Sequence, residues 1–72
     1  MIGVSMIEFI ENEPGKVWCA YRAATGLILG EVRHGTTGFQ VYILGVHARL
    51  VAQGAPHASL AAAKADLTNF LK

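Results

Sequence analysis

The sequence predicts an α+β domain in which an antiparallel β-meander of four to five strands is followed by one C-terminal α-helix packed on one face of the sheet. Two observations lead to this fold class. The apolar residues follow a period of two as far as about residue 52 and a helical period after it, and turn residues recur every 8 to 12 residues. Because consecutive strands joined by short turns pair as antiparallel neighbours, these strands form a meander.

The first three strands are separated by two recognisable turns. The first strand is expected within Met1 to Ile10 and ends in the acidic turn Glu11-Asn12-Glu13-Pro14-Gly15, where proline presets its own φ and glycine accepts a positive φ. The second strand, Lys16 to Ala23, is rich in β-branched and aromatic residues. Thr25-Gly26 closes a short hairpin that leads into the third strand, Leu27 to His34.

The fourth and fifth strands follow the same pattern. The turn Gly35-Thr36-Thr37-Gly38 leads into the fourth strand, Phe39 to Leu44. The alternating segment Val46 to Ala52 is expected to be the fifth strand.

The C-terminal helix is expected from about residue 59 to residue 71. Ser59 stands directly before an apolar run at helical spacing, as is typical of an N-cap, and the alanines in the run add helix propensity. The apolar stripe is narrow, so the helix covers one face of the sheet and not both. The stripe consists of Leu60, Ala63, Leu67 and either Phe70 or Leu71.

Alternation in the strands divides their side chains between two faces. Gly30 belongs to the face expected beneath the helix, where a close approach of the helix or of Trp18 to the backbone would require glycine. The opposite face mixes aromatic, aliphatic and charged residues, so it is either half-solvated or a contact surface. The helix-covered set is Trp18, Ala20, Arg22, Ile28, Gly30, Val32, Phe39, Val41, Ile43, Val46, Ala48 and Leu50, and the opposite set is Cys19, Tyr21, Leu27, Leu29, Glu31, Arg33, Gln40, Tyr42, Leu44, His47, Arg49 and Val51.

Length and composition restrict the class of protein. A chain of 72 residues forms a single domain, residues 1–72, because neither half could build its own core. A hydrophobic content of 53% against 15% charged residues excludes disorder. No apolar run reaches the roughly 18 residues of a membrane span, and the N-terminus lacks the pattern of a signal peptide. We therefore expect a cytoplasmic protein that does not enter the membrane.

A domain of this size needs additional stabilisation, because folding buries only about 60% of its unfolded surface. Cys19 is the only cysteine, so it cannot form an internal disulfide, and its place in a strand favours a structural role. His34, His47 and His57 lack the close pairing of metal ligands. We expect no metal and no cofactor, which leaves self-association as a source of stability.

No set of residues has the pattern of a catalytic site, so we expect a protein that is not an enzyme and has no catalytic residues. Glu31 and His47 share the uncovered face and are the best acid-base pair available. A surface carboxylate paired with Arg33 or Arg49 across strands is the more ordinary interpretation of Glu31. The turn at residues 35–38 matches the G-x-x-G loop of KH domains, but that loop joins helices and this one joins predicted strands.

The uncovered face carries the functional hypothesis. Its apolar residues would form a larger patch than a soluble monomer normally exposes, and aromatic residues beside arginine are typical of an interface core. We expect a protein partner or a second copy of the chain to bind there. The alternative is nucleic-acid binding by arginine and tyrosine, although the net charge of +1 is far from a basic footprint. The expected contact residues are Tyr21, Leu29, Arg33, Tyr42 and Arg49.

The chain also resembles small phage and prophage proteins. The pattern runs from Trp18 through Gly26 to Gly30-Glu31-Val32, continues with an aromatic strand, and ends in S-L-x-x-A-K-x-x-L between Ser59 and Leu67. Many of these proteins are β-meander-plus-helix domains of unknown function, and some families inhibit host machinery, including defence systems. The resemblance covers about two thirds of the chain. It implies a small accessory or inhibitor protein and assigns no catalytic residue.

Overall fold

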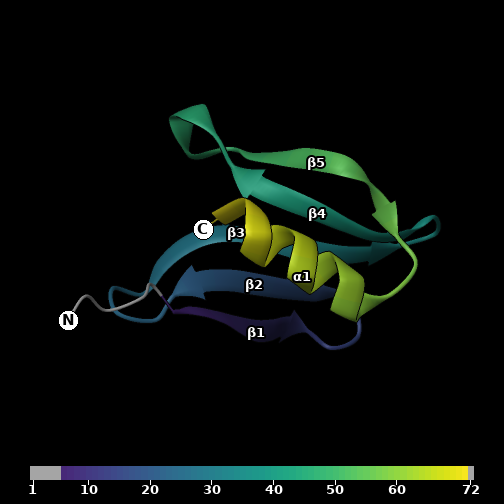
Figure 1. Ribbon diagram of the computed structural model, residues 1–72, viewed down its shortest axis with the longest axis horizontal. Helices are drawn as coiled ribbons and strands as arrows, with labels where there is room; N and C mark the ends of the chain where they lie inside the picture. The colour runs from purple at the N-terminus through teal and green to yellow at the C-terminus, as the bar shows by residue number, and fades with distance from the viewer. Residues whose placement is uncertain (1–5, 72) are drawn as a thin grey trace.

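The computed structural model describes residues 6–71, which form a five-stranded antiparallel meander followed by one helix (Figure 1). Each strand pairs with its neighbours in sequence, so the predicted α+β meander is confirmed with five strands. The elements are β1 (Ile7–Glu13), β2 (Val17–Arg22), β3 (Leu27–Gly35), β4 (Gly38–Leu44), the short 3-10 helix η1 (Val46–Ala48), β5 (Leu50–His57) and α1 (Leu60–Leu71).

The first hairpin begins later in the chain than predicted. β1 continues to Glu13, so part of the predicted acidic turn belongs to the strand, while residues 1–5 of the predicted first strand lie outside the described residues. The Lys16 N–H donates to the Glu13 carbonyl at 2.9 Å, and Gly15 supplies the positive φ of +72° that the turn requires. The Gly15 N–H also donates to Oε2 of Glu11 at 2.7 Å. The predicted second, third and fourth strands are confirmed.

The predicted fifth strand was wrong in its position. His47 and Ala48 have positive φ values of 61° and 56°, which lie outside the β region. Val46–Ala48 therefore form η1 and not part of a strand. The Gly45 N–H donates to the Arg49 carbonyl at 2.7 Å and closes the loop. Alternation begins again in β5, where Val51 lies opposite Ile43 and therefore faces the helix side, the reverse of its predicted side.

A bulge in β3 causes a second correction. Gly30 lies opposite Ala20 but Ile28 lies opposite Tyr21, which leaves Leu29 as an extra residue between the two pairs. Ile28 therefore shares the side of Tyr21 and is 47% exposed, although alternation predicted it in the core.

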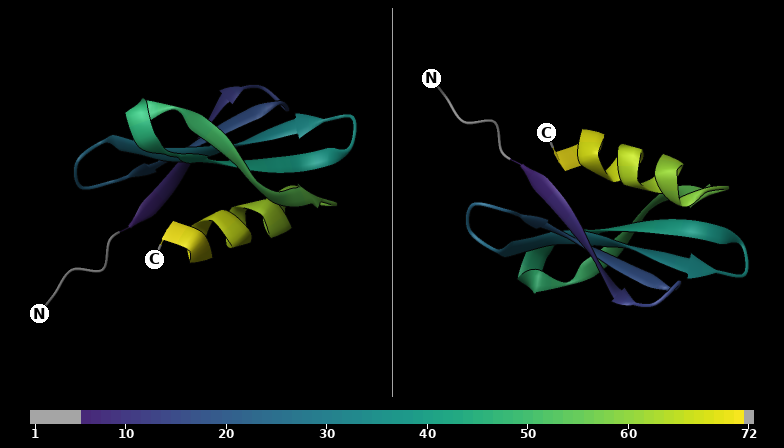
Figure 2. Two further views of the ribbon diagram at one scale, coloured as in Figure 1. Left: turned by 90° about the horizontal axis from the view of Figure 1, so that it is seen from above. Right: turned by 90° about the horizontal axis from the view of Figure 1, so that it is seen from below.

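The core lies between the sheet and α1, which covers one face of the sheet (Figure 2). A Cβ atom at Gly30 would lie 3.2 Å from Cδ1 of Leu67 and 2.5 Å from the Tyr42 carbonyl oxygen. The predicted close approach of the helix to Gly30 is thus confirmed. The buried hydrophobic residues are Trp18, Ala20, Val32, Val41, Ala63 and Leu67.

The helix begins and packs as its sequence predicted. The Ser59 side-chain oxygen accepts the Ala62 N–H at 3.1 Å, which confirms the N-cap. Leu71 packs against the core, whereas Phe70 is 49% exposed, so the structure selects Leu71 for the apolar stripe. Nε2 of His57 lies 3.0 Å from Oδ2 of Asp66 and links the end of β5 to the helix. Within residues 6–71, no helix is long and apolar enough to span a membrane.

Candidate interaction surface

The side of the sheet opposite α1 is referred to below as the open face. Strand register defines it, because residues that pair across antiparallel strands point their side chains to the same side. Its central row crosses the whole sheet, and further rows lie on either side. The open face comprises Ile10, Cys19, Glu31, Tyr42 and Ala52 in the central row, Glu8, Tyr21 and Ile28 beside it, Val17, Arg33 and Gln40 on its other side, and the pair Leu44 and Leu50.

A compact polar cluster occupies the middle of the open face. Glu31 is only 6% exposed, and its Oε2 accepts a hydrogen bond from Nε of Arg33 two residues along the same strand. The Arg33 guanidinium carbon lies 5.2 Å from the centre of the Tyr42 ring. Glu31 does pair with Arg33, but within β3 and not across strands as predicted, and Glu31 is buried and not a surface carboxylate. The hydrogen bond to Glu31 raises the pKa of Arg33, so this arginine stays charged and paired.

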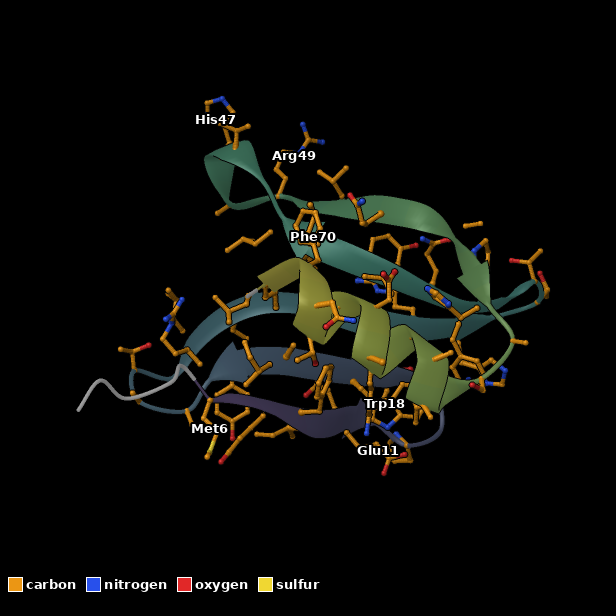
Figure 3. The ribbon with its side chains drawn as sticks, in the orientation of Figure 1. Met6, Glu11, Trp18, His47, Arg49 and Phe70 are labelled. Atoms are coloured by element: carbon orange, nitrogen blue, oxygen red, sulfur yellow. The ribbon has the colours of Figure 1, made fainter. Side chains whose placement is uncertain are left out.

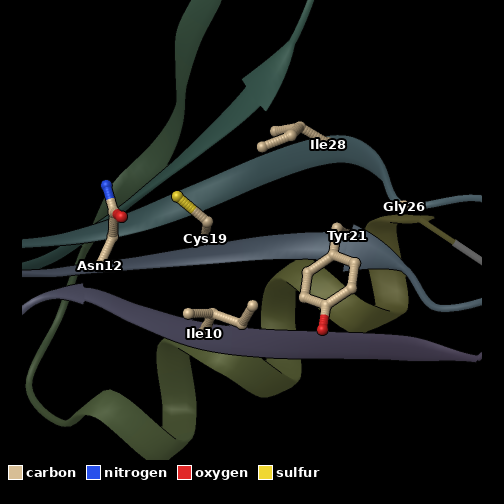
Figure 4. Close-up of a pocket in the computed structure, with 6 residues that line it drawn as sticks. All are labelled: Ile10, Asn12, Cys19, Tyr21, Gly26 and Ile28. Carbon is tan, nitrogen blue, oxygen red and sulfur yellow. The ribbon is translucent and has the colours of Figure 1, made fainter.

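A shallow, mainly apolar depression lies beside this cluster, over β1, β2 and β3 (Figure 4). The Tyr21 hydroxyl donates to Oε1 of Glu8 at 2.9 Å, and this bond raises the pKa of Tyr21. Partial burial, with the nearby Glu31 carboxylate, raises the pKa of Cys19. At neutral pH the sulfur is therefore a thiol and adds to the apolar surface. The lining residues are Ile10, Asn12, Cys19, Tyr21, Gly26 and Ile28.

Large apolar side chains on the open face remain in contact with solvent. Ile10 is 52% exposed and Ile28 is 47% exposed, and both line the depression. Leu44 is also exposed and pairs with the half-buried Leu50 at the end of the sheet. Exposed apolar residues that are grouped around a concave surface offer a continuous apolar area for another molecule to cover, whereas scattered apolar residues do not.

Three of the five predicted contact residues lie on the open face. Tyr21 lines the depression, and Arg33 contacts Tyr42 in the polar cluster. Leu29 does not pair with β2, because it is the extra residue of the bulge. Arg49 was predicted to lie in the fifth strand, but it lies in the loop between β4 and β5 (Figure 3).

Sequence reasoning placed Glu31 on this face but missed Ile10 and Ile28 as members of the surface. Ile10 has the same parity as the polar Glu8 and the opposite parity to Phe9, so a period of two in the first strand was a usable signal for its side. The side of Ile28 depends on the bulge, and the burial of Glu31 depends on its contact with Arg33, neither of which a pattern of apolar residues encodes.

The structure does not bring the best acid-base pair together. His47 lies in η1 beyond the end of the sheet (Figure 3). Glu31 lies in the middle of β3 and is bound to Arg33. Neither residue lines the depression. Among residues 6–71, no group of three or more histidine, cysteine, aspartate or glutamate side chains is placed to hold a metal ion.

The chain matches no protein-family model, and no curated protein and no solved structure is significantly similar to it.

Proposed function

We propose that this protein is a small non-enzymatic interaction domain that binds a protein partner, or a second copy of itself, through the open face. The observation that carries the proposal is the one-sided packing of α1. The helix contacts β3, β4 and β5 from one side, while Ile10 and Ile28 stay about half exposed on the other. Burying such side chains is worth roughly 1.5–3 kcal/mol each when it is complete, so a partner that covers them gains affinity.

The charges on the open face support an apolar contact. Arg33 is already neutralised by Glu31, and Tyr21 already donates its hydroxyl hydrogen to Glu8. A partner that covers this surface does not have to strip water from an unpaired arginine, which would oppose binding. Tyr21 and Tyr42 provide rigid aromatic surface of the kind found at the centres of protein interfaces.

The same geometry weighs against the nucleic-acid alternative. Arg33 lies near the β3–β4 turn, whereas Arg49 lies at the opposite end of the sheet in the loop between β4 and β5. Arg33 is also paired with a carboxylate. A single-stranded nucleic acid needs cations that follow its backbone beside the stacking residues, and these two arginines do not form such a track.

The resemblance to small phage and prophage proteins adds the biological setting of the proposal. An accessory or inhibitor protein that acts by occupying a partner's surface needs a contact face and no catalytic group. A cytoplasmic location, as expected from the sequence, would place this protein with such partners.

The proposal is tested by comparing two aspartate substitutions in capture experiments from the native cells. Ile28→Asp places a charge in the depression, and Val46→Asp makes the same change at a residue that is 79% exposed in η1, away from the open face. We expect the wild-type chain and Val46→Asp to retain a partner or a second copy in a stoichiometric complex, and Ile28→Asp to lose it. Circular dichroism checks that both variants are folded.

Two outcomes contradict the proposal. One is equal retention of the same protein by Ile28→Asp and by the wild-type chain. The other is a bound nucleic acid whose affinity falls steeply with salt concentration, because several phosphate contacts would then carry the binding.

A further inference from the structure

The two edges of the sheet differ in their ability to accept another strand. β5 forms one edge, and its second half is irregular, since Gly54 has a φ of +71° and Pro56 has no N–H. The register with β4 shifts between Phe39 and Val41, and Nε2 of Gln40 donates to the Gly54 carbonyl at 3.0 Å. A proline and a bulge are the usual features that protect an edge strand from further pairing.

β1 forms the other edge and is regular from Ile7 to Glu11. The Ala23 N–H donates to the Met6 carbonyl at 2.9 Å, so Met6 directs its backbone toward β2. In an antiparallel pair, every second residue directs its N–H and C=O to the partner strand. Glu8 and Ile10 therefore face β2, while Ile7, Phe9 and Glu11 direct their backbone groups outward, where the described chain has no further strand.

Two carboxylates flank these outward backbone groups. Glu8 lies opposite Tyr21 on the open face, and Glu11 lies opposite Trp18 on the helix side. Tyr21 hydrogen-bonds one oxygen of Glu8, and the Gly15 N–H bonds one oxygen of Glu11, which leaves the second oxygen of each for another donor. Antiparallel pairing of two copies through β1 would place two strands that each carry Glu8 and Glu11 side by side without any cation to pair with them, and like charges on adjacent strands are destabilising.

We propose that the β1 edge accepts an extended basic segment of a partner protein as a sixth, antiparallel strand. The outward N–H and C=O groups of Ile7, Phe9 and Glu11 supply the hydrogen bonds. A lysine or arginine opposite Glu11 and another opposite Glu8 supply the charge complementarity, so the segment carries its basic residues three positions apart. An apolar residue between them lies beside Ile10. The β1 edge adjoins the open face and shares Glu8 and Ile10 with it, but the backbone groups that would pair point outward from the sheet, so the inference does not depend on the proposed function.

The experiment uses the isotope-labelled full chain and a nine-residue peptide of valine and threonine with lysines at positions 4 and 7. A matched peptide has glutamates at both positions. Chemical-shift titration measures the affinity, and amide hydrogen exchange locates the new hydrogen bonds. We expect binding of the lysine peptide only, with exchange slowed at Phe9 and Glu11 and unchanged at Glu8 and Ile10, whose amides already face β2.

Charge reversal in the protein tests the register. Glu8→Lys and Glu11→Lys should each weaken binding of the lysine peptide about 3- to 10-fold and should strengthen binding of the glutamate peptide. The reason is that each substitution changes a cross-strand pair worth up to about 1 kcal/mol from attraction to repulsion. Glu13→Lys is the control, because it makes the same change in charge beyond the irregularity that ends the regular part of β1.

Three results would overturn the inference. The first is that the lysine peptide does not bind, and the second is that it binds without slowing amide exchange at Phe9 and Glu11. The third is that Glu13→Lys weakens binding of the lysine peptide as much as Glu8→Lys and Glu11→Lys do. Each result concerns strand pairing at the β1 edge, whereas the role of the open face is tested separately by Ile28→Asp.

Discussion

Gly30 shows how one residue without a side chain permits the packing of the whole domain. The Leu67 side chain occupies the space above its Cα atom, and the Tyr42 carbonyl lies beside it on the neighbouring strand. Alternation predicted from the sequence alone that Gly30 lies on the covered face, together with the apolar residues Val32 and Ala20. A glycine inside a strand also indicates a place where another part of the chain approaches the backbone closely.

Gly30→Ala should therefore destabilise the protein by about 1–3 kcal/mol, because the added methyl group meets backbone that cannot move aside easily. Gly35→Ala is the matched control, since a Cβ there meets nothing within 4 Å, and it should be neutral or stabilising by up to about 1 kcal/mol. Urea unfolding followed by circular dichroism gives both values. Equal midpoints for the two variants would refute the close contact.

Cys19 provides a pH-dependent test of the packing on the open face. Its pKa is raised by burial and by Glu31, so between its ordinary pKa and the raised value the folded protein holds a proton that the unfolded chain has released. The thiol therefore contributes stability below its ordinary pKa, and this contribution is lost as the pH rises through the folded value.

Alkylation with iodoacetamide measures the same shift, because only the thiolate reacts. The pH midpoint of the rate should lie higher in the folded protein than in the protein unfolded in urea, with a small free thiol as the reference. A folded midpoint at or below the unfolded one would show that Cys19 lies in a more polar environment than the open face provides.

At the scale of the elements, the turns were the most predictable part of the fold. Pro14-Gly15, Thr25-Gly26 and the turn at residues 35–38 each specify a local backbone conformation, so the second, third and fourth strands followed from them. The helix followed from Ser59 and the helical period of the leucines. These signals are local, and local signals can be read from one sequence.

The elements that could not be predicted depend on backbone geometry that side chains do not signal. Val46 to Arg49 alternates like a strand, yet the bond from Gly45 to Arg49 closes a loop there. The bulge at Leu29 turns Ile28 to the open face without any glycine or proline at its own position. Both errors changed the candidate site, because a shift of one residue moves side chains to the other face.

Leu67→Ala tests the packing of the helix element. Leu67 is fully buried between α1 and the sheet, so its truncation should cost about 2–5 kcal/mol. Phe70→Ala removes a larger side chain from the same helix, but because Phe70 is about half exposed the loss should be smaller. Urea titration gives both values, and a loss under about 0.5 kcal/mol for Leu67→Ala would refute the assigned face.

The molecule as a whole has two layers, the sheet and α1, and the helix layer is incomplete. One helix of 12 residues covers part of one face of a five-stranded sheet, and the other face carries the Glu31–Arg33 ion pair, of which only Glu31 is buried, together with the exposed Ile10 and Ile28. The hydrophobic content of 53% exceeds what this single core accommodates, and part of the excess lies on the open face. A protein surface that covers the open face would add a third layer on the other side of the sheet.

Hydroxyl-radical footprinting of the complex captured from native cells tests this central claim most directly, because it reports which side chains lose contact with water. We predict that Ile10, Ile28 and Tyr42 become less reactive in the complex, while Val46 and Phe70, which are exposed away from the open face, react as in the free protein. Protection of Val46 and Phe70 with unchanged reactivity at Ile10 and Ile28 would contradict the account.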